Sequence, residues 1–210
     1  MREAGTRSTL SAQRRYDRQA GTYDLREAPL ELLFRRWRRR IWSLVPEGGH
    51  VLEIGVGTGK NLPFYPQRTD LFTFDLSPKM LAKARRQAAL QTVDADLALM
   101  DAQSLGLAEA SFDVAIATFV FCSVPDALRG LEEARRALRP EGRLLLLEHV
   151  RSKMPVLGRC MDLGNNAAVA LTGANINRDT TSNVERAGFT VLEERDLFLD
   201  IVKLIVATPA

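Results

Sequence analysis

Residues 50–59, HVLEIGVGTG, constrain the fold of this chain more than any other stretch. The first half is an apolar run with the length of a buried strand. The second half carries three glycines at alternate positions, Gly55, Gly57 and Gly59. Glycine tolerates positive φ and lets a ligand come close to the backbone. A strand that ends in such a turn and leads into a helix predicts the first half of a nucleotide-binding crevice in an α/β sheet.

Two details separate this turn from a dinucleotide site. The spacing is G-x-G-x-G, so the third glycine of a G-x-G-x-x-G pattern would fall on Lys60. Glu53 places an acid at the strand end, which would repel a pyrophosphate and attract a cation. S-adenosylmethionine (SAM) is a nucleoside that carries a sulfonium and an ammonium group but no phosphate. The residues resemble motif I of the class I SAM-dependent methyltransferases, E-x-G-x-G-x-G.

A carboxylate follows at the distance expected for ribose binding. Asp75 ends an apolar run and lies 16 residues beyond Gly59, close to the spacing at which nucleotide-binding α/β units place an acid on ribose hydroxyls. Ser77 and Pro78 then have the residue types of a helix cap and a first helical position. The stretch D-L-S-P-K-M-L at 75–81 is characteristic of the same methyltransferases, and A-S-F-D-V and L-R-P-E-G-R-L further along resemble their signatures.

Apolar runs and turn residues predict seven strands, the last two as an antiparallel pair. With the resemblance, they imply an α/β fold: a Rossmann-like seven-stranded sheet, mostly parallel, with an antiparallel C-terminal hairpin and helices on both faces. A helix is expected from about residue 155 to 171, and no linker divides the chain. We therefore expect one SAM-binding domain over residues 1–210, with 1–45 as an N-terminal lid and basic amphipathic helix.

The basic character of the chain belongs to its N-terminal part. Residues 1–45 hold eleven arginines and five acids, a balance of +6, whereas the rest of the chain has a balance of −3. The two cysteines are not close in sequence, so neither a zinc site nor a disulfide framework is predicted, and no metal is expected. No apolar run reaches the length of a membrane span, and no secretory signal precedes the domain. These features predict a cytoplasmic protein.

The N-terminal part predicts three segments. Residues 1–12 are polar and are expected to fray. Tyr16 and Tyr23 lie seven apart, on one side of a predicted helix that resembles the lid of small-molecule methyltransferases. Residues 28–45 predict an amphipathic helix with Leu, Phe, Trp and Ile on one side and arginines 35, 36, 38, 39 and 40 on the other.

That arginine face has two interpretations. It is a solvated surface, or it contacts anionic lipid at the inner face of a membrane. Nucleic acid is not an expected partner, because exposed aromatic residues do not interleave with the arginines and no nucleic-acid-binding motif follows.

The resemblance also implies where the cofactor binds. Asp75 would hold the ribose, Asp101 would accept from the adenine amino group, and the Ala102 N–H would serve a ring nitrogen. The full predicted set for SAM, and for the product S-adenosylhomocysteine, is Tyr16, Glu53, Gly55, Gly57, Thr58, Gly59, Asn61, Asp75, Leu76, Met80, Asp101, Ala102, Thr118 and Phe119.

Methyl transfer from a sulfonium needs alignment more than it needs a protein nucleophile. His149, at the end of a predicted central strand, and Tyr23 are the catalytic candidates, although a hydrogen-bonded structural histidine is the more ordinary outcome. Cys122, Asn177 and Arg178 are the candidates for acceptor binding, and Cys122 also suits simple core packing.

Three further pieces, G-V-G-T-G-K-N-L-P-F-Y, C-S-V-P-D and L-L-E-H-V-R, resemble one branch of the family. That branch includes ubiquinone and menaquinone C-methyltransferase relatives, bacterial phosphatidylethanolamine N-methyltransferases and membrane-associated thiol methyltransferases. The expected function is methyl transfer to a lipidic or amphipathic acceptor, with phosphatidylethanolamine-type N-methylation first. Quinone-precursor C-methylation, small-thiol S-methylation and a non-catalytic SAM-binding module are the alternatives. The sequence predicts no oligomeric state.

Overall fold

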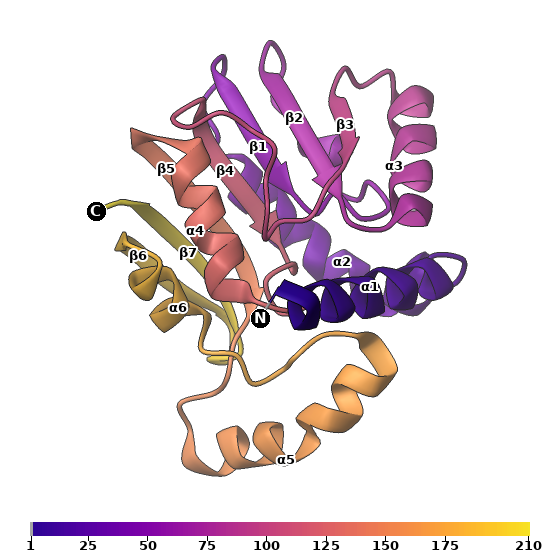
Figure 1. Ribbon diagram of the computed structural model, residues 1–210, viewed down its shortest axis with the longest axis vertical. Helices are drawn as coiled ribbons and strands as arrows, with labels where there is room; N and C mark the ends of the chain where they lie inside the picture. The colour runs from indigo at the N-terminus through magenta and orange to yellow at the C-terminus, as the bar shows by residue number, and fades with distance from the viewer. Residues whose placement is uncertain (1) are drawn as a thin grey trace.

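A seven-stranded sheet runs through the chain in the order β3-β2-β1-β4-β5-β7-β6 (Figure 1). The computed structural model describes residues 2–210, and side chains from residue 7 onward. The strands are β1 (His50–Ile54), β2 (Asp70–Asp75), β3 (Asp96–Leu99), β4 (Phe112–Thr118), β5 (Leu138–His149), β6 (Phe189–Phe198) and β7 (Val202–Pro209).

The first five strands are parallel, and β7 runs antiparallel to both β5 and β6. This arrangement confirms the predicted Rossmann-like sheet with its C-terminal antiparallel hairpin. Because the central strands are parallel, Ile54, Asp75 and Thr118 bring the carboxyl ends of β1, β2 and β4 to one edge. Ligands bind at this edge in open α/β sheets, so the topology already locates the site.

Alternate residues of the central strands pack into two separate hydrophobic cores, one on each face of the sheet, because successive side chains of a strand point to opposite faces. Ala115 and Ala117 of β4 pack with helices α4 and α6, whereas Val114 and Ile116 pack with α2. The helices are α1 (Arg2–Gln19), α2 (Tyr23–Trp42), α3 (Pro78–Gln91), α4 (Ala127–Ala137), α5 (Pro155–Thr172) and α6 (Thr180–Arg186), with a 3-10 turn at Leu62–Phe64. The predicted helices on both faces are therefore confirmed.

The N-terminal part differs from its prediction. Residues 2–12, expected to fray, belong to α1, where the Thr9 hydroxyl donates to Asp101 at 3.1 Å. A turn around Gly21 separates α1 from α2, so Tyr16 and Tyr23 lie on different helices rather than on one. The second helix begins at Tyr23 instead of near residue 28, and Pro29 lies inside it.

The two sides of α2 also differ from the expected pattern. Phe34, Trp37 and Ile41 are buried against the sheet, as predicted. Arg38, expected on the solvated side, is buried. The reverse change affects three leucines of the predicted apolar side, which are exposed: Leu30, Leu33 and Leu44. The arginine face is therefore smaller than the sequence pattern indicates, and one of its members points inward.

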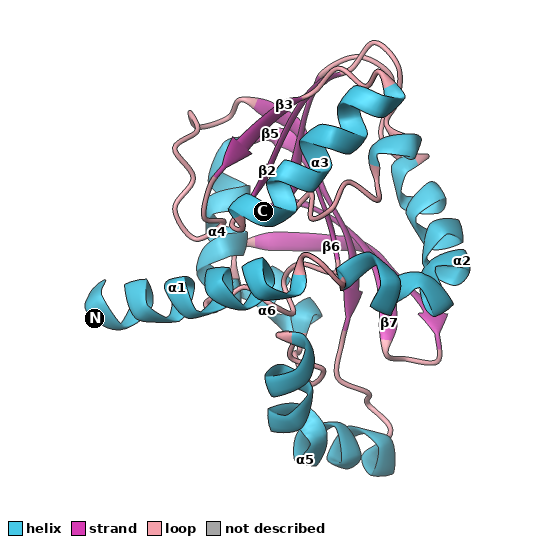
Figure 2. Cartoon of the chain, turned by 90° about the vertical axis from the view of Figure 1, so that its right-hand side faces the viewer, coloured by secondary structure: helices cyan, strands magenta, loops and turns pink. Residues whose placement is uncertain are grey.

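Helix α5 occupies an outlying position. It follows β5 and projects from the carboxyl edge of the sheet, away from the helices that cover the two faces (Figures 1 and 2). Its observed bounds, Pro155–Thr172, agree with the predicted helix, and Gly173 ends it in the left-handed conformation. Among the helices within residues 2–210, none has both the length and the apolar character required to cross a bilayer.

Candidate functional site

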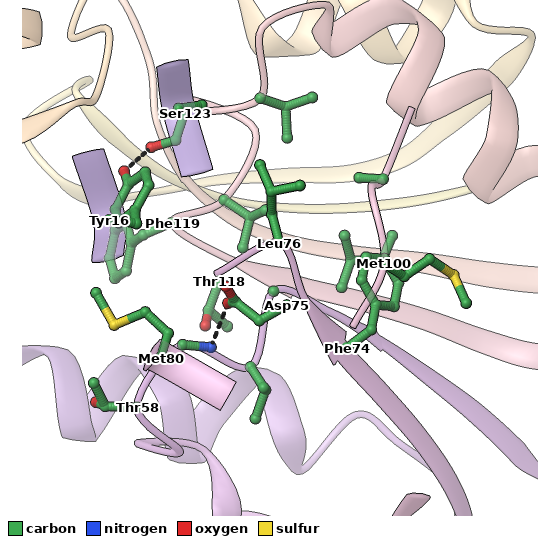
Figure 3. Close-up of a pocket in the computed structure, with 18 of the residues that line it drawn as sticks. Tyr16, Thr58, Phe74, Asp75, Leu76, Met80, Met100, Thr118, Phe119 and Ser123 are labelled. Carbon is green, nitrogen blue, oxygen red and sulfur yellow. Dashed lines mark hydrogen bonds between the residues drawn. The ribbon is translucent and has the colours of Figure 1, made fainter. Parts of the chain in front are cut away.

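A cavity opens at the carboxyl edge of β1, β2 and β4, and α1 and α2 form its roof. It encloses about 870 Å³, including its mouth. Figure 3 shows side chains around it from the sheet, the glycine turn and α1, among them Phe74, Thr58 and Tyr16. The predicted residues that line it are Tyr16, Tyr23, Gly55, Gly57, Thr58, Asp75, Leu76, Met80, Asp101, Ala102, Thr118 and Phe119.

The glycine turn forms one wall. Gly55 has φ +75°, and a Cβ there would lie 2.6 Å from a methyl group of Val120. Both the backbone conformation and the lack of space therefore exclude a side chain at this position. Gly57 also has positive φ but faces open space, which leaves its backbone accessible to a ligand. Gly59 does not line the cavity. A Cβ there would lie 3.3 Å from the Ala84 Cα, so this glycine permits close packing on α3.

Asp75 is the acid beside this turn. Its carboxylate accepts from the Gly57 N–H at 2.9 Å and the Ser77 N–H at 2.8 Å. Burial raises the pKa of Asp75 to about 6, and these amides act in the opposite direction. The two amides fix the carboxylate at the cavity, where it can accept from the vicinal hydroxyls of a ribose.

Asp101, Ala102 and Met100 line another part of the cavity. The Asp101 carboxylate accepts from the Gln103 backbone N–H at 3.0 Å and from the Gln103 side-chain amide. It also accepts from Thr9 of α1, so the roof is hydrogen-bonded to the wall at this point.

Glu53 and Asn61 lie behind the cavity and do not line it. Glu53 has no exposed surface, and its carboxylate accepts from Asn61, Thr73 and the Tyr65 hydroxyl. Burial raises the pKa of Glu53. The acid of motif I therefore organises the base of the turn through Asn61 rather than facing the ligand.

Arg38 extends from that network into the cavity. Its Nη1 donates to Asn61 Oδ1 at 2.9 Å and to Thr118 Oγ1 at 2.8 Å, which fixes the guanidinium. Its Nε is buried without a hydrogen-bond partner among the described residues. The nearest acid is Glu31, 3.9 Å from that nitrogen. Arg38 is thus a buried cation with unused donors at the cavity, which suits an anionic group.

Lys60 is the second cation of the cavity. Its Nζ lies 2.7 Å from Glu31 and 5.6 Å from the centre of the Tyr23 ring. The sequence analysis assigned no role to Lys60 and placed Arg38 on the solvated face. The signal in the sequence is that Arg38 lies four residues after Phe34 and three before Ile41, which places it on the same side of a helix as these apolar residues.

The two tyrosines of the roof come from different helices. The Tyr16 hydroxyl is hydrogen-bonded to the Ser123 hydroxyl across the cavity (Figure 3). Burial raises the pKa of both Tyr16 and Tyr23, so both hydroxyls keep their protons at neutral pH. They can orient an acceptor, but neither is a base at that pH.

Thr118 and Phe119 lead from β4 into the loop that closes the remaining side. Phe119 has φ +59°, an uncommon value for a bulky residue. The loop is held by the buried Glu148 carboxylate, which accepts from the N–H groups of Val120 at 2.7 Å and Phe121 at 2.8 Å. Burial raises the pKa of Glu148 to about 7.

The remaining four candidates do not line the cavity. The His149 ring packs 4.9 Å from the Phe119 ring, centre to centre, and burial lowers the pKa of His149. Cys122 is buried, and its carbonyl accepts from Asn175. Asn177 donates to Asp162 of α5 at 3.2 Å, away from the cavity. Arg178 donates to the carbonyl of Val124, a lining residue, at 2.7 Å and so supports the rim from outside.

The family model of a methyltransferase domain matches residues 52–146, which include the glycine turn, Asp75, Asp101 and β4. This chain belongs to the class I SAM-dependent methyltransferases. A solved SAM-dependent methyltransferase from Thermotoga maritima, described as a possible histamine N-methyltransferase, has the same fold with a TM-score of 0.71. The two sequences are 21% identical, and the match covers 95% of this chain and 100% of the Thermotoga maritima chain.

Two curated relatives of this methyltransferase are more similar to it in sequence than the solved Thermotoga maritima protein is. A phosphatidylethanolamine N-methyltransferase of Cereibacter sphaeroides is 37% identical over 57% of this chain and 60% of its own length. A thiol S-methyltransferase of Mus musculus is 31% identical over 68% of this chain and 61% of its own length. The matches thus span about three fifths of each relative.

The family implies SAM as the cofactor, and the cavity fits it. The open backbone at Gly57 admits a close ligand, Asp75 offers a fixed acceptor for hydroxyls, and Arg38 offers unused donors for a carboxylate. The predicted site residues that line the cavity lie together at this edge of the sheet, and their role in cofactor binding stays a prediction.

Proposed function

We propose that this methyltransferase transfers the methyl group of SAM to a lipidic acceptor, with the amine of phosphatidylethanolamine as the first candidate. The 37% identity to a phosphatidylethanolamine N-methyltransferase carries this proposal. The roofed cavity supports it, because methyl transfer requires a site from which water is largely excluded. In this proposal, residues 1–210 act as one methyltransferase domain.

The chain's residues would hold both reactants. Asp75 binds the ribose hydroxyls, Asp101 and Ala102 the adenine, and Arg38 with Lys60 the carboxylate of the methionyl group. When bound, SAM supplies an activated methyl on a sulfonium. The Tyr16 and Tyr23 hydroxyls and the Phe119 ring then orient the acceptor for in-line attack.

An amine acceptor must lose its proton before it attacks. Neither His149 nor any other histidine lines the cavity, and both tyrosines stay protonated. Burial offers another route, because a site that excludes water disfavours the charged ammonium form of an amine. The cavity would therefore favour the neutral, nucleophilic form of the amine without a dedicated base. His149, beneath Phe119, keeps a supporting role in this proposal.

A thiol acceptor is the second candidate. The similarity to a thiol S-methyltransferase supports this alternative.

A direct assay tests the proposal. The purified protein is incubated with SAM labelled in its methyl group and, in parallel, with phosphatidylethanolamine, an alkyl thiol or a demethylated quinone precursor. We expect label in the phospholipid amine. Label only in the thiol or the quinone precursor would refute the phospholipid assignment and leave methyl transfer standing.

Asp75→Asn tests the cofactor part of the proposal separately. It keeps the size of the side chain but removes the charge that holds the ribose, so SAM affinity by titration calorimetry should fall about tenfold or more. Asp94→Asn, an exposed loop residue, is the matched control and should bind SAM normally. Equal affinity of both variants would contradict the ribose role of Asp75.

A further inference from the structure

Helix α5 carries its apolar side outward. Val156, Leu163 and Leu171 are 76%, 86% and 73% exposed. With Cys160 and Ala167, which are also exposed, they recur at intervals of four, three, four and four residues. This spacing places all five on one narrow side of a helix. We call this set the α5 stripe.

The opposite side of α5 faces the protein. Gly158 is buried, and Met161 and Asn165 are partly buried. Asn165 accepts from the Ile176 N–H at 2.9 Å, and Met161 Sδ accepts from the Ser152 N–H at 3.3 Å. The helix is thus oriented by specific contacts, and the exposure of the stripe is a fixed feature of the fold rather than a result of free rotation.

The charges near the stripe identify its partner. Residues 151–178 hold four basic side chains and one acid: Arg151, Lys153, Arg159, Arg178 and Asp162. The single acid is paired with Arg151 at 2.8 Å. Arg178 points inward to the Val124 carbonyl, and Lys153, with its side chain 78% exposed, lies 3.9 Å from Glu194. Arg159 borders the stripe and is exposed. An exposed apolar side bordered by basic residues is the pattern of a helix that lies on an anionic bilayer.

A second copy of this chain fits the stripe less well. A symmetric dimer would bring the same patch together from both sides, and with it the same basic surplus. A bilayer that contains anionic lipid accepts the apolar side chains and attracts the bases at once.

We propose that the α5 stripe docks this protein on an anionic lipid bilayer. The inference rests on the proposed function in taking the bilayer as the source of the acceptor. It differs from the expected contact through the arginines of residues 28–45, because it places the membrane contact on the apolar side of α5.

The position of α5 relates this surface to the cavity. The Leu171 carbonyl accepts from Gln19 at the end of α1, at 3.4 Å. Gly173, the residue that ends α5, lies against Tyr16, since a Cβ there would be 3.4 Å from the Tyr16 hydroxyl. Docking through the stripe would therefore bring the membrane close to the side of the roof that Tyr16 forms.

The test uses flotation of the full chain with vesicles of phosphatidylcholine, with or without phosphatidylglycerol. We expect the wild type to float with the phosphatidylglycerol vesicles. Val156→Gln, Leu163→Gln and Leu171→Gln together should reduce the bound fraction about tenfold, because glutamine removes the apolar contact and retains helix propensity. Leu90→Gln with Leu192→Gln is the matched control, since both leucines are exposed on other elements, and it should float like the wild type.

Four outcomes would overturn the docking proposal. They are no binding by the wild type, equal binding by the stripe variant, equal loss in the control, and a dimer in solution that the stripe variant abolishes. Flotation requires no methyl transfer, so it is independent of the assay above. Methylation of a water-soluble short-chain phosphatidylethanolamine by a wild type that does not float would refute docking alone. Flotation without methylation of any phosphatidylethanolamine would refute the proposed acceptor alone.

Discussion

Arg38 is one of five arginines between residues 35 and 40, and it is the one that the fold buries. Its neighbours Arg35, Arg36 and Arg39 are exposed. A helix turns 100° per residue, so adjacent arginines face different surroundings. The inward position leaves the Arg38 guanidinium fixed by Asn61 and Thr118 with donors to spare.

Arg38→Met tests this position at the residue scale. Methionine has a similar length and no charge, so we expect SAM affinity to fall about tenfold to a hundredfold, the worth of charged hydrogen bonds at roughly 1.5–3 kcal/mol. Titration calorimetry measures the change, and circular dichroism checks the fold. Arg39→Met is the matched control and should bind SAM normally. Unchanged affinity in a folded Arg38→Met protein would remove Arg38 from the cofactor site.

The sequence located the polar groups of the sheet edge well because each directly follows a strand. Asp75, Asp101 and Thr118 end or follow apolar runs, and topology alone brings such positions together. It was less informative for Glu53 and His149, which the strand pattern also places near that edge. The Glu53 side chain points toward Asn61 and the His149 side chain toward Phe119, both in the packed interior. A strand pattern does not show which side chains pack against the end of a strand.

At the scale of elements, α1 and α2 are connected to the cofactor wall by acids. Asp17 of α1 accepts from the Ser77 hydroxyl at 2.6 Å and the Lys79 N–H at 3.2 Å, at the start of α3. Asp24 of α2 accepts from the Thr58 hydroxyl at 2.6 Å and pairs with Lys83 at 3.0 Å. The roof is therefore attached by hydrogen bonds to the elements that it covers.

Asp17→Ala together with Asp24→Ala should loosen this roof. The double variant removes four contacts between the N-terminal helices and the wall, so local opening becomes more frequent. Limited trypsin digestion should cleave at Arg14, Arg15 and Arg18 several-fold faster than in the wild type. Asp94→Ala controls for the loss of an exposed acid. Cleavage at the wild-type rate would show that the other contacts of α1 and α2 hold the roof without these two acids.

The bounds of α5 and of β7 follow from local signals, such as Pro155 at the first turn and the apolar alternation near the C-terminus. The division between α1 and α2 was not predicted, because the Tyr-Asp repeat obscured the turn at Gly21. The direction of the α5 stripe was not predicted either. Helical spacing shows that a side is apolar, but only tertiary contacts show whether that side faces the core.

At the scale of the whole molecule, Glu148 makes stability depend on pH. Its carboxyl is fully buried, and burial raises its pKa to about 7 from 4.5. Arg178 and the amides of residues 120–122 oppose this shift, while Cys122, whose pKa is itself raised by burial, lies in the same loop. The folded state therefore holds a proton that the unfolded state releases, so stability from this group is present below about pH 4.5 and is lost as pH rises through 7.

Glu148→Gln should remove that dependence. Glutamine keeps one oxygen acceptor and cannot ionise. We expect the free energy of unfolding of the wild type, relative to the variant, to fall by about 2.5 kcal/mol between pH 5 and pH 8. Urea unfolding at several pH values gives both curves. Parallel curves over this range would show that Glu148 does not change its protonation there.

The apolar side of α2 has a consequence for folding during synthesis on the ribosome. Phe34, Trp37 and Ile41 pack with side chains of β5 and of β7, the last strand of the chain. An emerging chain thus exposes these aromatic and aliphatic groups from the outset, while the partners on β7 are the last to be translated. The apolar side of α2 is therefore fully covered only when the final strand enters the sheet.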